Sequence, residues 1–305
     1  MYDVIVIGGG PAGMTAALYA LRNGKSVLVI EKEGFGGQIT HSPKVENYPG
    51  SISISGNELA DKMLDQILQQ GAEIEFETVN GIQVHNTYKT VSTEEGNQFE
   101  CKAVIIATGV KHRLLGLPGE KELIGEGISF CAVCDGDFYT DKTVCVVGGG
   151  NSALQEAILL AGKCRKVIIL QDLPELTGES RLQDVLAKAE NVQILKNQSV
   201  KEYLTEDSVF IGVCTESKID GTIRSILCDG LFLAIGLIPE NEPFQNVAKL
   251  NSVGYFDSDE RCTTETPGIY VAGDCRSKQI RQITTAASDG AVAALAACRF
   301  IDTMQ

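Results

Sequence analysis

The sequence predicts an α/β fold with two similar domains, the second of which is inserted into the first. Residues 4–18 and 144–158 share one pattern, in which a β-rich apolar run leads into a glycine turn and a helical segment. The same offset continues without a gap into a second apolar run, residues 26–31 in one copy and 166–171 in the other. A further strand and turn at residues 268–275 precedes a helix of small residues, and we place both with the first copy.

Each copy has the order strand, helix, strand. Apolar runs without polar alternation indicate strands that are buried on both faces of a parallel sheet. A further strand ends each copy in a glycine-containing turn, at residues 103–109 and 231–236. We therefore expect two Rossmann-like, three-layer ββα domains, the second inserted in the first.

The C-terminal strand and helix set the domain boundaries, because they return the chain to the first domain. We expect the first domain to comprise residues 1–114 and 244–305, and the inserted domain to comprise residues 115–243. The connections would lie near residues 117–119 and 238–239, where proline and glycine interrupt the apolar pattern.

The composition is that of a globular protein and excludes several classes of function. The chain has 305 residues, of which 44% are hydrophobic and 22% charged, and its net charge is −14. Such an acidic chain lacks the basic footprint of a nucleic-acid binder and is repelled by anionic membranes. No apolar run reaches about 18 residues and the first residues carry no basic stretch, so we expect no membrane span, no export signal and a cytoplasmic location.

The first glycine turn has the pattern of a pyrophosphate-binding loop. Residues 8–13 match G-x-G-x-x-G and stand between a predicted strand and a predicted helix. Gly8 permits the tight turn, Gly10 lets a ligand approach the backbone, and Gly13 allows close packing of the helix on the strand. The helix start offers free N–H groups, and Glu31 ends the next strand, where a carboxylate accepts hydrogen bonds from a ribose diol. The alternative is a structural turn without a ligand.

A pair of cysteines is the second candidate site. Of the ten cysteines, only Cys131 and Cys134 have C-x-x-C spacing, which can close into a small, exchange-competent disulfide. Asp135 directly after the pair could move a proton as a thiolate leaves. The alternatives are half of a metal site for the pair and a turn residue for Asp135. Because no second C-x-x-C and only three histidines are present, we expect no metal site.

Together these motifs resemble the low-molecular-weight thioredoxin reductases, and the resemblance covers nearly the whole chain. The matching segments are GGGPAG at 8–13, GGQ at 36–38, ENYPG at 46–50, ATG at 107–109, CAVCDG at 131–136, GD at 273–274 and RQ at 281–282. The resemblance implies FAD in the first domain, thioredoxin as the substrate and a homodimer. It also implies that Cys134 faces the flavin, that Cys131 attacks the substrate, and that Asp135 is the acid/base. In this family the inserted domain rotates so that the cysteines alternate between flavin and solvent.

The same resemblance names the residues around FAD. In the glycine loop and the following strand they are Gly8, Gly10, Pro11, Ala12, Gly13, Glu31 and Lys32, with Gly37, Gln38 and Asn47 after them. The later ones are Thr108, Gly109, Gly273, Asp274, Arg281, Gln282 and Ile283.

The inserted domain departs from the family pattern. It keeps a glycine loop at 148–153, with Ala153 in place of the third glycine, but it lacks the arginines that grip the 2′-phosphate of NADPH. Losing two or three charge-assisted hydrogen bonds would weaken NADPH binding by roughly two to five orders of magnitude. The segment after the second strand instead carries Asp172 and Glu175. NADH remains open, although the position matching Glu31 is the neutral Gln171, and the loop could also be a scaffold turn beside an empty cleft.

A branch of the family lacks the pyridine-nucleotide motifs and takes electrons from ferredoxin, and this sequence resembles that ferredoxin-dependent flavin thioredoxin reductase type. The expected function is therefore electron transfer from ferredoxin through FAD and the cysteine pair to thioredoxin. The alternatives are an NADH- or NADPH-dependent thioredoxin reductase and a flavin redox sensor without turnover. An acidic ferredoxin would need a local basic patch, for which residues 111–113, 163–166 and 276–281 are candidates.

Overall fold

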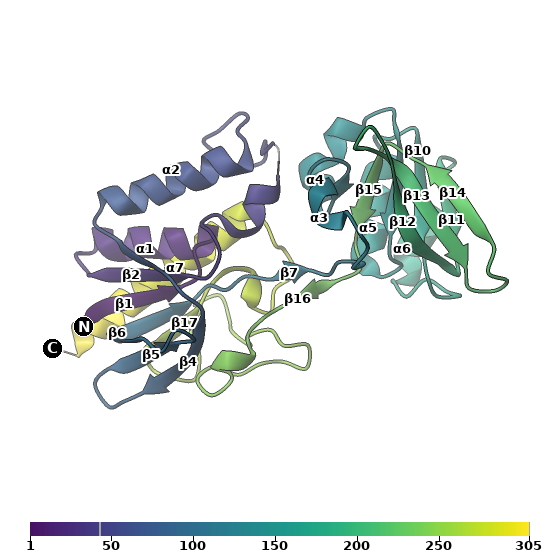
Figure 1. The fold of residues 1–305 in the computed structure, drawn as a ribbon. Coiled ribbons are helices and arrows are strands. Elements are labelled where there is room, and N and C mark those ends of the chain that lie inside the picture. Colours follow the sequence, from purple (N-terminus) through teal and green to yellow (C-terminus); the bar gives the residue numbers. More distant parts are fainter. Residues whose placement is uncertain (43, 305) are drawn as a thin grey trace. The chain divides into compact units, whose positions relative to one another are not determined.

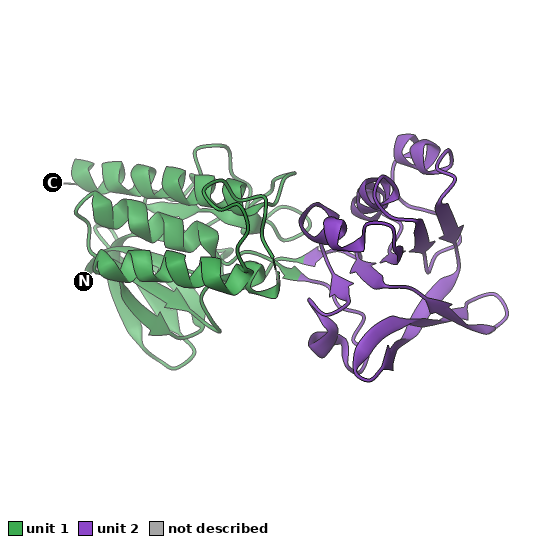
Figure 2. Ribbon diagram, turned by 90° about the horizontal axis from the view of Figure 1, so that it is seen from above, with its two compact units in different colours: residues 1–111, 238–305 green, residues 112–237 purple. Residues whose placement is uncertain are grey.

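The computed structural model describes residues 1–42 and 44–304 and divides into two compact α/β units (Figure 2). Unit 1 comprises residues 1–111 and 238–305, and unit 2 comprises residues 112–237. Each unit contains a parallel sheet with helices packed on it, which agrees with the predicted Rossmann-like architecture.

Unit 1 is built on a seven-stranded sheet with the order β3-β2-β1-β6-β5-β4, in which β17 also pairs with β6 (Figure 1). The strands are β1 (Tyr2–Ile7), β2 (Val27–Glu31), β3 (Glu73–Phe76), β4 (Val79–Val84), β5 (Lys89–Thr93), β6 (Gln98–Ile106) and β17 (Ile269–Val271). The helices are α1 (Pro11–Arg22), α2 (Gly56–Gln69) and α7 (Ile283–Thr303), with short 3-10 turns η1 (Gly37–His41), η3 (Glu242–Phe244) and η4 (Gly273–Cys275). The strands β1, β2, β3, β6 and β17 pair in parallel, and β4 and β5 join antiparallel.

The central strands of unit 1 are apolar throughout because both faces of the sheet are covered. In β1, Val4 and Val6 pack toward α1, α2 and α7, whereas Ile5 and Ile7 pack into the core on the opposite face. The small residues of α7 allow its backbone to approach α1 closely. A Cβ added at Gly290 would lie 2.1 Å from the carbonyl oxygen of Ala12.

Unit 2 repeats the parallel arrangement with the strand order β11-β10-β9-β15-β8, and it adds an antiparallel sheet β12-β13-β14 (Figure 1). Its strands are β8 (Ile128–Ser129), β9 (Thr143–Val147), β10 (Lys166–Leu170), β11 (Val192–Leu195), β12 (Gln198–Glu206), β13 (Val209–Ser217), β14 (Ile223–Leu227) and β15 (Gly230–Leu233). Its helices are α3 (Glu120–Leu123), α4 (Ala132–Asp135), α5 (Asn151–Ala161) and α6 (Ser180–Leu186), with the 3-10 turn η2 (Gly136–Tyr139).

The two connections between the units pair with each other. The short strands β7 (Lys111–His112) and β16 (Leu237–Ile238) form a two-stranded sheet, and the Arg113 N–H donates to the Gly236 carbonyl at 2.9 Å. The compact units therefore change over at residues 111/112 and 237/238. The expected limits of the inserted domain, 115 and 243, lie further along the chain, because the sequence pattern does not reveal this pairing.

Within the described part of the chain, no helix combines the length and apolarity that crossing a membrane requires. The helix α7 has 21 residues, but it carries Asp289, Arg299 and Asp302 and packs against α1. The described residues also contain no cluster of three or more metal-ligating side chains of the His, Cys, Asp or Glu type.

Candidate functional site

The glycine loop between β1 and α1 requires glycine at two of its positions. Gly8 has φ +110°, and a Cβ there would lie 2.4 Å from the carbonyl oxygen of Ala107. A Cβ at Gly13 would lie 1.9 Å from the carbonyl oxygen of Gly8. At Gly10, in contrast, no described atom lies within 4 Å of the Cβ position, and no described side chain caps α1. The loop is thus open beside the N-terminal N–H groups of a twelve-residue helix, which is an arrangement that binds anions.

Glu31 lies against this loop, as the sequence predicts. One of its carboxylate oxygens accepts the Gly9 N–H at 2.6 Å, and the other accepts the Glu33 N–H at 2.9 Å. Lys32 forms an ion pair with Glu240 of the same unit.

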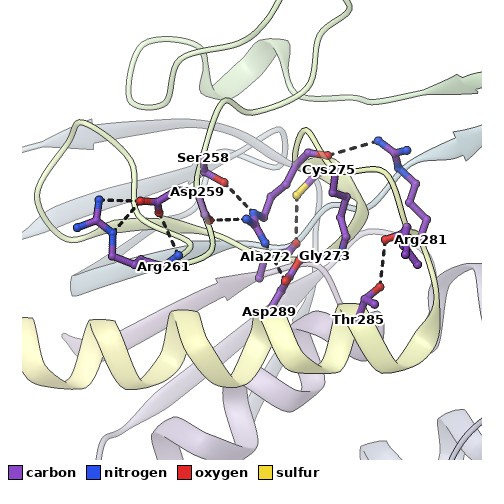
Figure 3. Close-up of polar contacts among 12 residues, drawn as sticks. Ser258, Asp259, Arg261, Ala272, Gly273, Cys275, Arg281, Thr285 and Asp289 are labelled. Atoms are coloured by element: carbon purple, nitrogen blue, oxygen red, sulfur yellow. Dashed lines mark hydrogen bonds and ion pairs between the residues drawn. The ribbon is translucent and has the colours of Figure 1, made fainter.

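A second segment, the turn after β17, reaches the start of α1. Gly273 has φ +82°, and a Cβ there would lie 2.8 Å from the Cβ of Ala12. The Gly273 N–H donates to the carboxylate of Asp289 at 3.0 Å (Figure 3). Asp289 also forms ion pairs with the buried Arg276 at 2.7 Å and with Lys278 at 2.9 Å. This charge network fixes the turn that carries Asp274.

Asp274 presents a buried oxygen that lacks a partner. Its Oδ1 has no hydrogen-bond partner among the described residues. Burial raises the pKa of this carboxyl to about 6, although the cations of Lys278 and Arg281 oppose the rise. Buried polar atoms are nearly always hydrogen-bonded, so this oxygen marks a place where a ligand hydroxyl could donate.

The other predicted cofactor residues also lie in unit 1. Asn47 Nδ2 donates to Gln282 Oε1 at 3.1 Å, and Gln282 caps α7, whose first residue is Ile283. Gly37 and Gln38 begin η1, and the Cβ position of Gly37 is 3.6 Å from the Cα of Gly10. Arg281 lies with its guanidinium 4.5 Å from the ring centroid of Tyr255, and its Nε donates to the Asp274 carbonyl at 3.4 Å. Pro11 and Ala12 open α1, and Thr108 and Gly109 follow β6.

Sequence reasoning missed Asn241. The Thr108 hydroxyl donates to Asn241 Oδ1 at 3.0 Å, and Asn241 Nδ2 donates to the carbonyls of Gly254 and Cys275 at 2.9 and 3.0 Å. Asn241 is fully buried in unit 1. The expected boundary at 243 had assigned it to the other unit, and no local motif points to it.

In unit 2, Cys131 and Cys134 form a disulfide with their Cα atoms 5.3 Å apart. The pair brackets the start of α4, and the Cys134 N–H lies 3.2 Å from the Cys131 sulfur. Val133 between them is exposed. The other eight cysteines are free thiols, and all except the half-buried Cys214 are buried.

Asp135 is tied to the disulfide through Ser129. The Ser129 hydroxyl donates to Asp135 Oδ2 at 2.6 Å and accepts the Cys131 N–H at 3.1 Å. Oδ1 of Asp135 is buried and has no hydrogen-bond partner among the described residues. Burial raises the pKa of Asp135, and the hydrogen bond from Ser129 opposes that rise. A carboxyl of this kind can hold a proton close to a reacting sulfur.

A second carboxyl beside the pair, Glu156 on α5, was missed from the sequence. Its Oε2 accepts the N–H of Ala132, the residue that follows Cys131. Burial raises the pKa of Glu156 to about 7, and the charge of Asp135 adds to the rise. Glu156 lies on a different element from the cysteines, so only the packing of α5 on α4 brings it to the site.

The glycine loop of unit 2, between β9 and α5, keeps the backbone of the first loop. Gly148 has φ +127°, and the third glycine is replaced by Ala153. Gln171, the counterpart of Glu31, is buried, and its amide donates to the Glu175 carbonyl at 3.1 Å. A Cβ at Gly149 would lie 2.5 Å from that amide, so the Gln171 side chain lies directly on the loop.

The segment after β10 carries acids that are already paired. Asp172 forms an ion pair with Lys218 at 2.8 Å, and Glu175 forms one with Lys196 at 2.5 Å. The sequence pattern does not reveal these two lysines, because α6 and β11 lie between the segment and Lys196, and β12 and β13 lie between Lys196 and Lys218.

With this geometry in hand, comparisons with known proteins identify the family. The model of the pyridine nucleotide-disulphide oxidoreductase family matches residues 2–290. The chain belongs to the pyridine nucleotide-disulphide oxidoreductase family. Thioredoxin reductases of Listeria monocytogenes and Bacillus subtilis are 41% and 40% identical over 305 residues, which cover 100% of this chain and 95% and 96% of theirs. The crystal structure of thioredoxin reductase from Streptococcus pyogenes has a TM-score of 0.94 and 40% identity, with 99% of each chain covered.

This pyridine nucleotide-disulphide oxidoreductase uses FAD as its cofactor, and the residues of unit 1 fit it. The open face at Gly10 and the uncapped start of α1 suit a pyrophosphate. The Glu31 carboxylate beside the loop could accept hydrogen bonds from a ribose diol, and the unpartnered oxygen of Asp274 could accept one from a hydroxyl group. When bound, FAD supplies the redox chemistry.

The structure changes the list of basic patches on this oxidoreductase. In the segment 276–281, Arg276 is buried and paired with Asp289, which also binds Lys278. Arg276 and Lys278 are therefore part of the network that supports the Gly273 turn. Lys111 pairs with Glu33 and Glu240, both at 3.3 Å, and Lys163 pairs with Asp137.

Proposed function

We propose that this oxidoreductase takes electrons from reduced ferredoxin and passes them through FAD and the Cys131–Cys134 disulfide to thioredoxin. One turnover would use two reduced ferredoxins and two protons to convert one thioredoxin disulfide into a dithiol. The named relatives that span nearly the whole chain are thioredoxin reductases, which supports the acceptor. The redox-active pair is the disulfide in unit 2.

The residues of unit 1 would hold FAD, which would supply the electron pair for reduction of the Cys131–Cys134 disulfide. The Cys131 thiolate then attacks one sulfur of the thioredoxin disulfide, and the other sulfur leaves as a thiolate that takes up a proton. Asp135, whose pKa is raised by burial, holds the proton for this step. The Cys134 thiolate next attacks Cys131, which releases the second thioredoxin sulfur and restores the disulfide.

The donor assignment depends on one observation, the chemistry at the end of β10. The residue that would bind an adenosine ribose is Gln171, whose amide is buried and already bonded to the Glu175 carbonyl. Asp172 and Glu175 already occupy the ammonium groups of Lys218 and Lys196, so a 2′-phosphate would have to displace them. Each missing charge-assisted contact removes about 1.5–3 kcal/mol. Pyridine nucleotides are therefore poor ligands for this loop.

Ferredoxin is energetically suited to replace them. A low-potential ferredoxin near about −400 mV against thioredoxin near about −270 mV leaves roughly 130 mV. For two electrons this is on the order of 6 kcal/mol downhill. FAD can accept single electrons and deliver a pair, as a one-electron donor and a disulfide acceptor require.

A specific observation favours a second candidate, an NADPH- or NADH-dependent thioredoxin reductase. Lys196 and Lys218 bring two ammonium groups to the segment after β10. A nucleotide phosphate that displaced Glu175 and Asp172 from them would find cations there. The glycine loop at Gly148 also keeps the positive φ of a dinucleotide turn.

Anaerobic flavin reduction with three donors side by side tests the proposal. The FAD-loaded enzyme is mixed with reduced ferredoxin, NADPH or NADH, and the flavin absorbance is followed. We expect rapid bleaching with ferredoxin only. Rapid bleaching by either nucleotide would replace the ferredoxin assignment with the second candidate.

The variant Cys131→Ser is the matched control. Its flavin should still be reduced by the true donor, while thioredoxin reduction should fall to background. If wild type reduces its flavin but transfers nothing to thioredoxin, a redox sensor without turnover is the better description.

The proposal also includes a homodimer in the cytoplasm, which rests on the resemblance to the family. Sedimentation of the FAD-loaded enzyme should give twice the 32.7 kDa mass of one chain. A monomer under all conditions would contradict this part of the proposal.

A further inference from the structure

A carboxylate on a neighbouring helix holds the backbone of the redox turn. Glu156 on α5 accepts the N–H of Ala132, the first residue of α4 and the one that follows Cys131. Ala132 is buried and Glu156 is half-buried, so this contact is partly shielded from water. The Glu156 carboxylate therefore binds the backbone N–H of the residue next to Cys131, whose sulfur is expected to attack thioredoxin.

The groups around Glu156 leave its charge without a cation. From α4 it faces Asp135, a second acid whose charge opposes its own. Within the described residues, no lysine or arginine forms an ion pair with Glu156, and Lys163 near the end of α5 pairs with Asp137 instead. From η2, Tyr139 also lies close to Asp135. The partners of the two acids are the N–H of Ala132 and the hydroxyl of Ser129.

We propose that Glu156 is a positioning residue that fixes the Cys131–Ala132 backbone and, in its charged form, opposes formation of the Cys131 thiolate. The inference rests on the proposed function in one respect, that Cys131 is the attacking thiol. It goes beyond that function because it gives the disulfide a second acid, separate from Asp135.

The consequence is a coupled titration of Glu156 and Cys131. At low pH Glu156 is neutral, because its pKa is about 7, and it does not oppose a thiolate nearby. As the pH rises Glu156 becomes charged. In molecules with a charged Glu156, the Cys131 thiol ionises less readily. Two groups that repel in this way titrate over a wider pH range than one isolated thiol does. Removing the charge of Glu156 should make the ionisation of Cys131 span a narrower pH range and move its midpoint to lower pH.

Alkylation of Cys131 in the full-length, FAD-loaded enzyme measures this directly. The disulfide is reduced anaerobically with dithiothreitol, the thiols are reacted with iodoacetamide from about pH 5.5 to about pH 9.5, and Cys131 is quantified by peptide mass spectrometry. Glu156→Gln keeps an acceptor for the Ala132 N–H and removes the charge. Glu156→Ala removes both. Gln155→Ala, at the exposed neighbouring position on α5, is the matched control.

We expect Glu156→Gln to alkylate Cys131 about three- to tenfold faster than wild type near pH 8, with a single narrow transition. Gln155→Ala should follow the wild-type curve. Glu156→Ala should be as narrow as Glu156→Gln, and its thioredoxin reduction should be slower than that of Glu156→Gln, since the backbone contact is lost as well.

Two results overturn the inference. One is a Glu156→Gln curve with the midpoint and width of wild type, and the other is a Gln155→Ala curve that shifts as far as that of Glu156→Gln. Thioredoxin reduction by wild type is measured in parallel and tests the proposed function separately. If that transfer is absent while the Glu156→Gln shift is present, the proposed function fails and the role of Glu156 stands.

Discussion

The two glycine loops of this chain share a backbone conformation but carry different side chains at their edges. Gly8 in unit 1 and Gly148 in unit 2 both have a strongly positive φ and both precede a helix. In unit 1 the first turn of that helix needs Gly13, because any Cβ there would meet the carbonyl oxygen of Gly8. In unit 2 the same position is Ala153, so α5 starts at a distance that leaves room for a methyl group.

The hydrogen-bond acceptors beside the two loops also differ. Glu31 offers a carboxylate to the first loop, and Asp274 adds an unpartnered buried oxygen. In the second loop, Gln171 donates from Nε2 to the Glu175 carbonyl and carries a neutral amide oxygen in place of a carboxylate. The comparison teaches that a repeated fold preserves the turn while the side chains at its edge differ, so the function of each loop has to be argued from those side chains.

Gly13→Ala should give the largest effect. The new methyl group would lie 1.9 Å from the Gly8 carbonyl oxygen, and the backbone cannot yield there without opening the loop. We expect loss of bound FAD and at least about 3 kcal/mol lower free energy of unfolding. The counterpart Ala153→Gly should cost only about 1 kcal/mol, the helix-propensity difference. Flavin absorbance and urea unfolding measure both, and full FAD occupancy in Gly13→Ala would break the comparison.

The pH dependence of stability should show the buried acid of unit 2. The pKa of Glu156 is raised from 4.5 to about 7 in the folded chain, so the folded state binds the proton more tightly than the unfolded state does. Its contribution is therefore most favourable below about pH 4.5 and is lost as the pH rises through 7. Glu156→Gln should remove this loss, which amounts to at most about 3 kcal/mol between about pH 4.5 and about pH 8. Urea unfolding of both proteins across this range tests the sign, and parallel curves would contradict it.

Glu31→Gln should weaken the binding of FAD at the first loop by about 1.5–3 kcal/mol, since a charge-assisted acceptor becomes a neutral one. The dissociation constant of FAD would then rise roughly 10- to 100-fold, as measured by flavin fluorescence. The reciprocal Gln171→Glu should not create a nucleotide site, because it removes the donor that bonds the Glu175 carbonyl. Appearance of NADH-driven flavin reduction in Gln171→Glu would show that the side chain alone decides the difference.

The smallest effect is expected for Lys196→Ala and Lys218→Ala. Both lysines lie in exposed ion pairs, which contribute below about 1 kcal/mol to stability. Flavin reduction by ferredoxin should be unchanged in the double variant. A loss of nucleotide-driven reduction in that variant would instead support the second candidate function, and stopped-flow absorbance distinguishes the two.

The sequence predicted those features whose residues lie close together along the chain. The loop at Gly8, the acid at Glu31 and the Cys131–Cys134 pair are set by spacing along one stretch of chain. The parallel sheets follow from unbroken apolar runs such as β1 and β9. Each lies where a short segment dictates its own geometry.

The residues that were missed depend on contacts between distant segments. Asn241 meets Thr108, and Glu156 meets Ala132, across separate elements of their units. The sequence showed Asp172 after β10 but not the lysine that pairs with it, because Lys218 lies far along the chain. No spacing rule reports such encounters, because tertiary packing alone creates them.

The pairing of β7 with β16 bears on the order in which the chain assembles. The two segments of unit 1 can meet only when the whole stretch between them forms a closed loop, and closing a disordered loop of that length costs about 4 kcal/mol in entropy. Once unit 2 has folded, its first and last residues already lie side by side. The folded insert then connects the two segments of unit 1 at a short distance, so the entropy cost of closing a long loop is no longer incurred. Early folding of unit 2 should therefore accelerate the folding of unit 1.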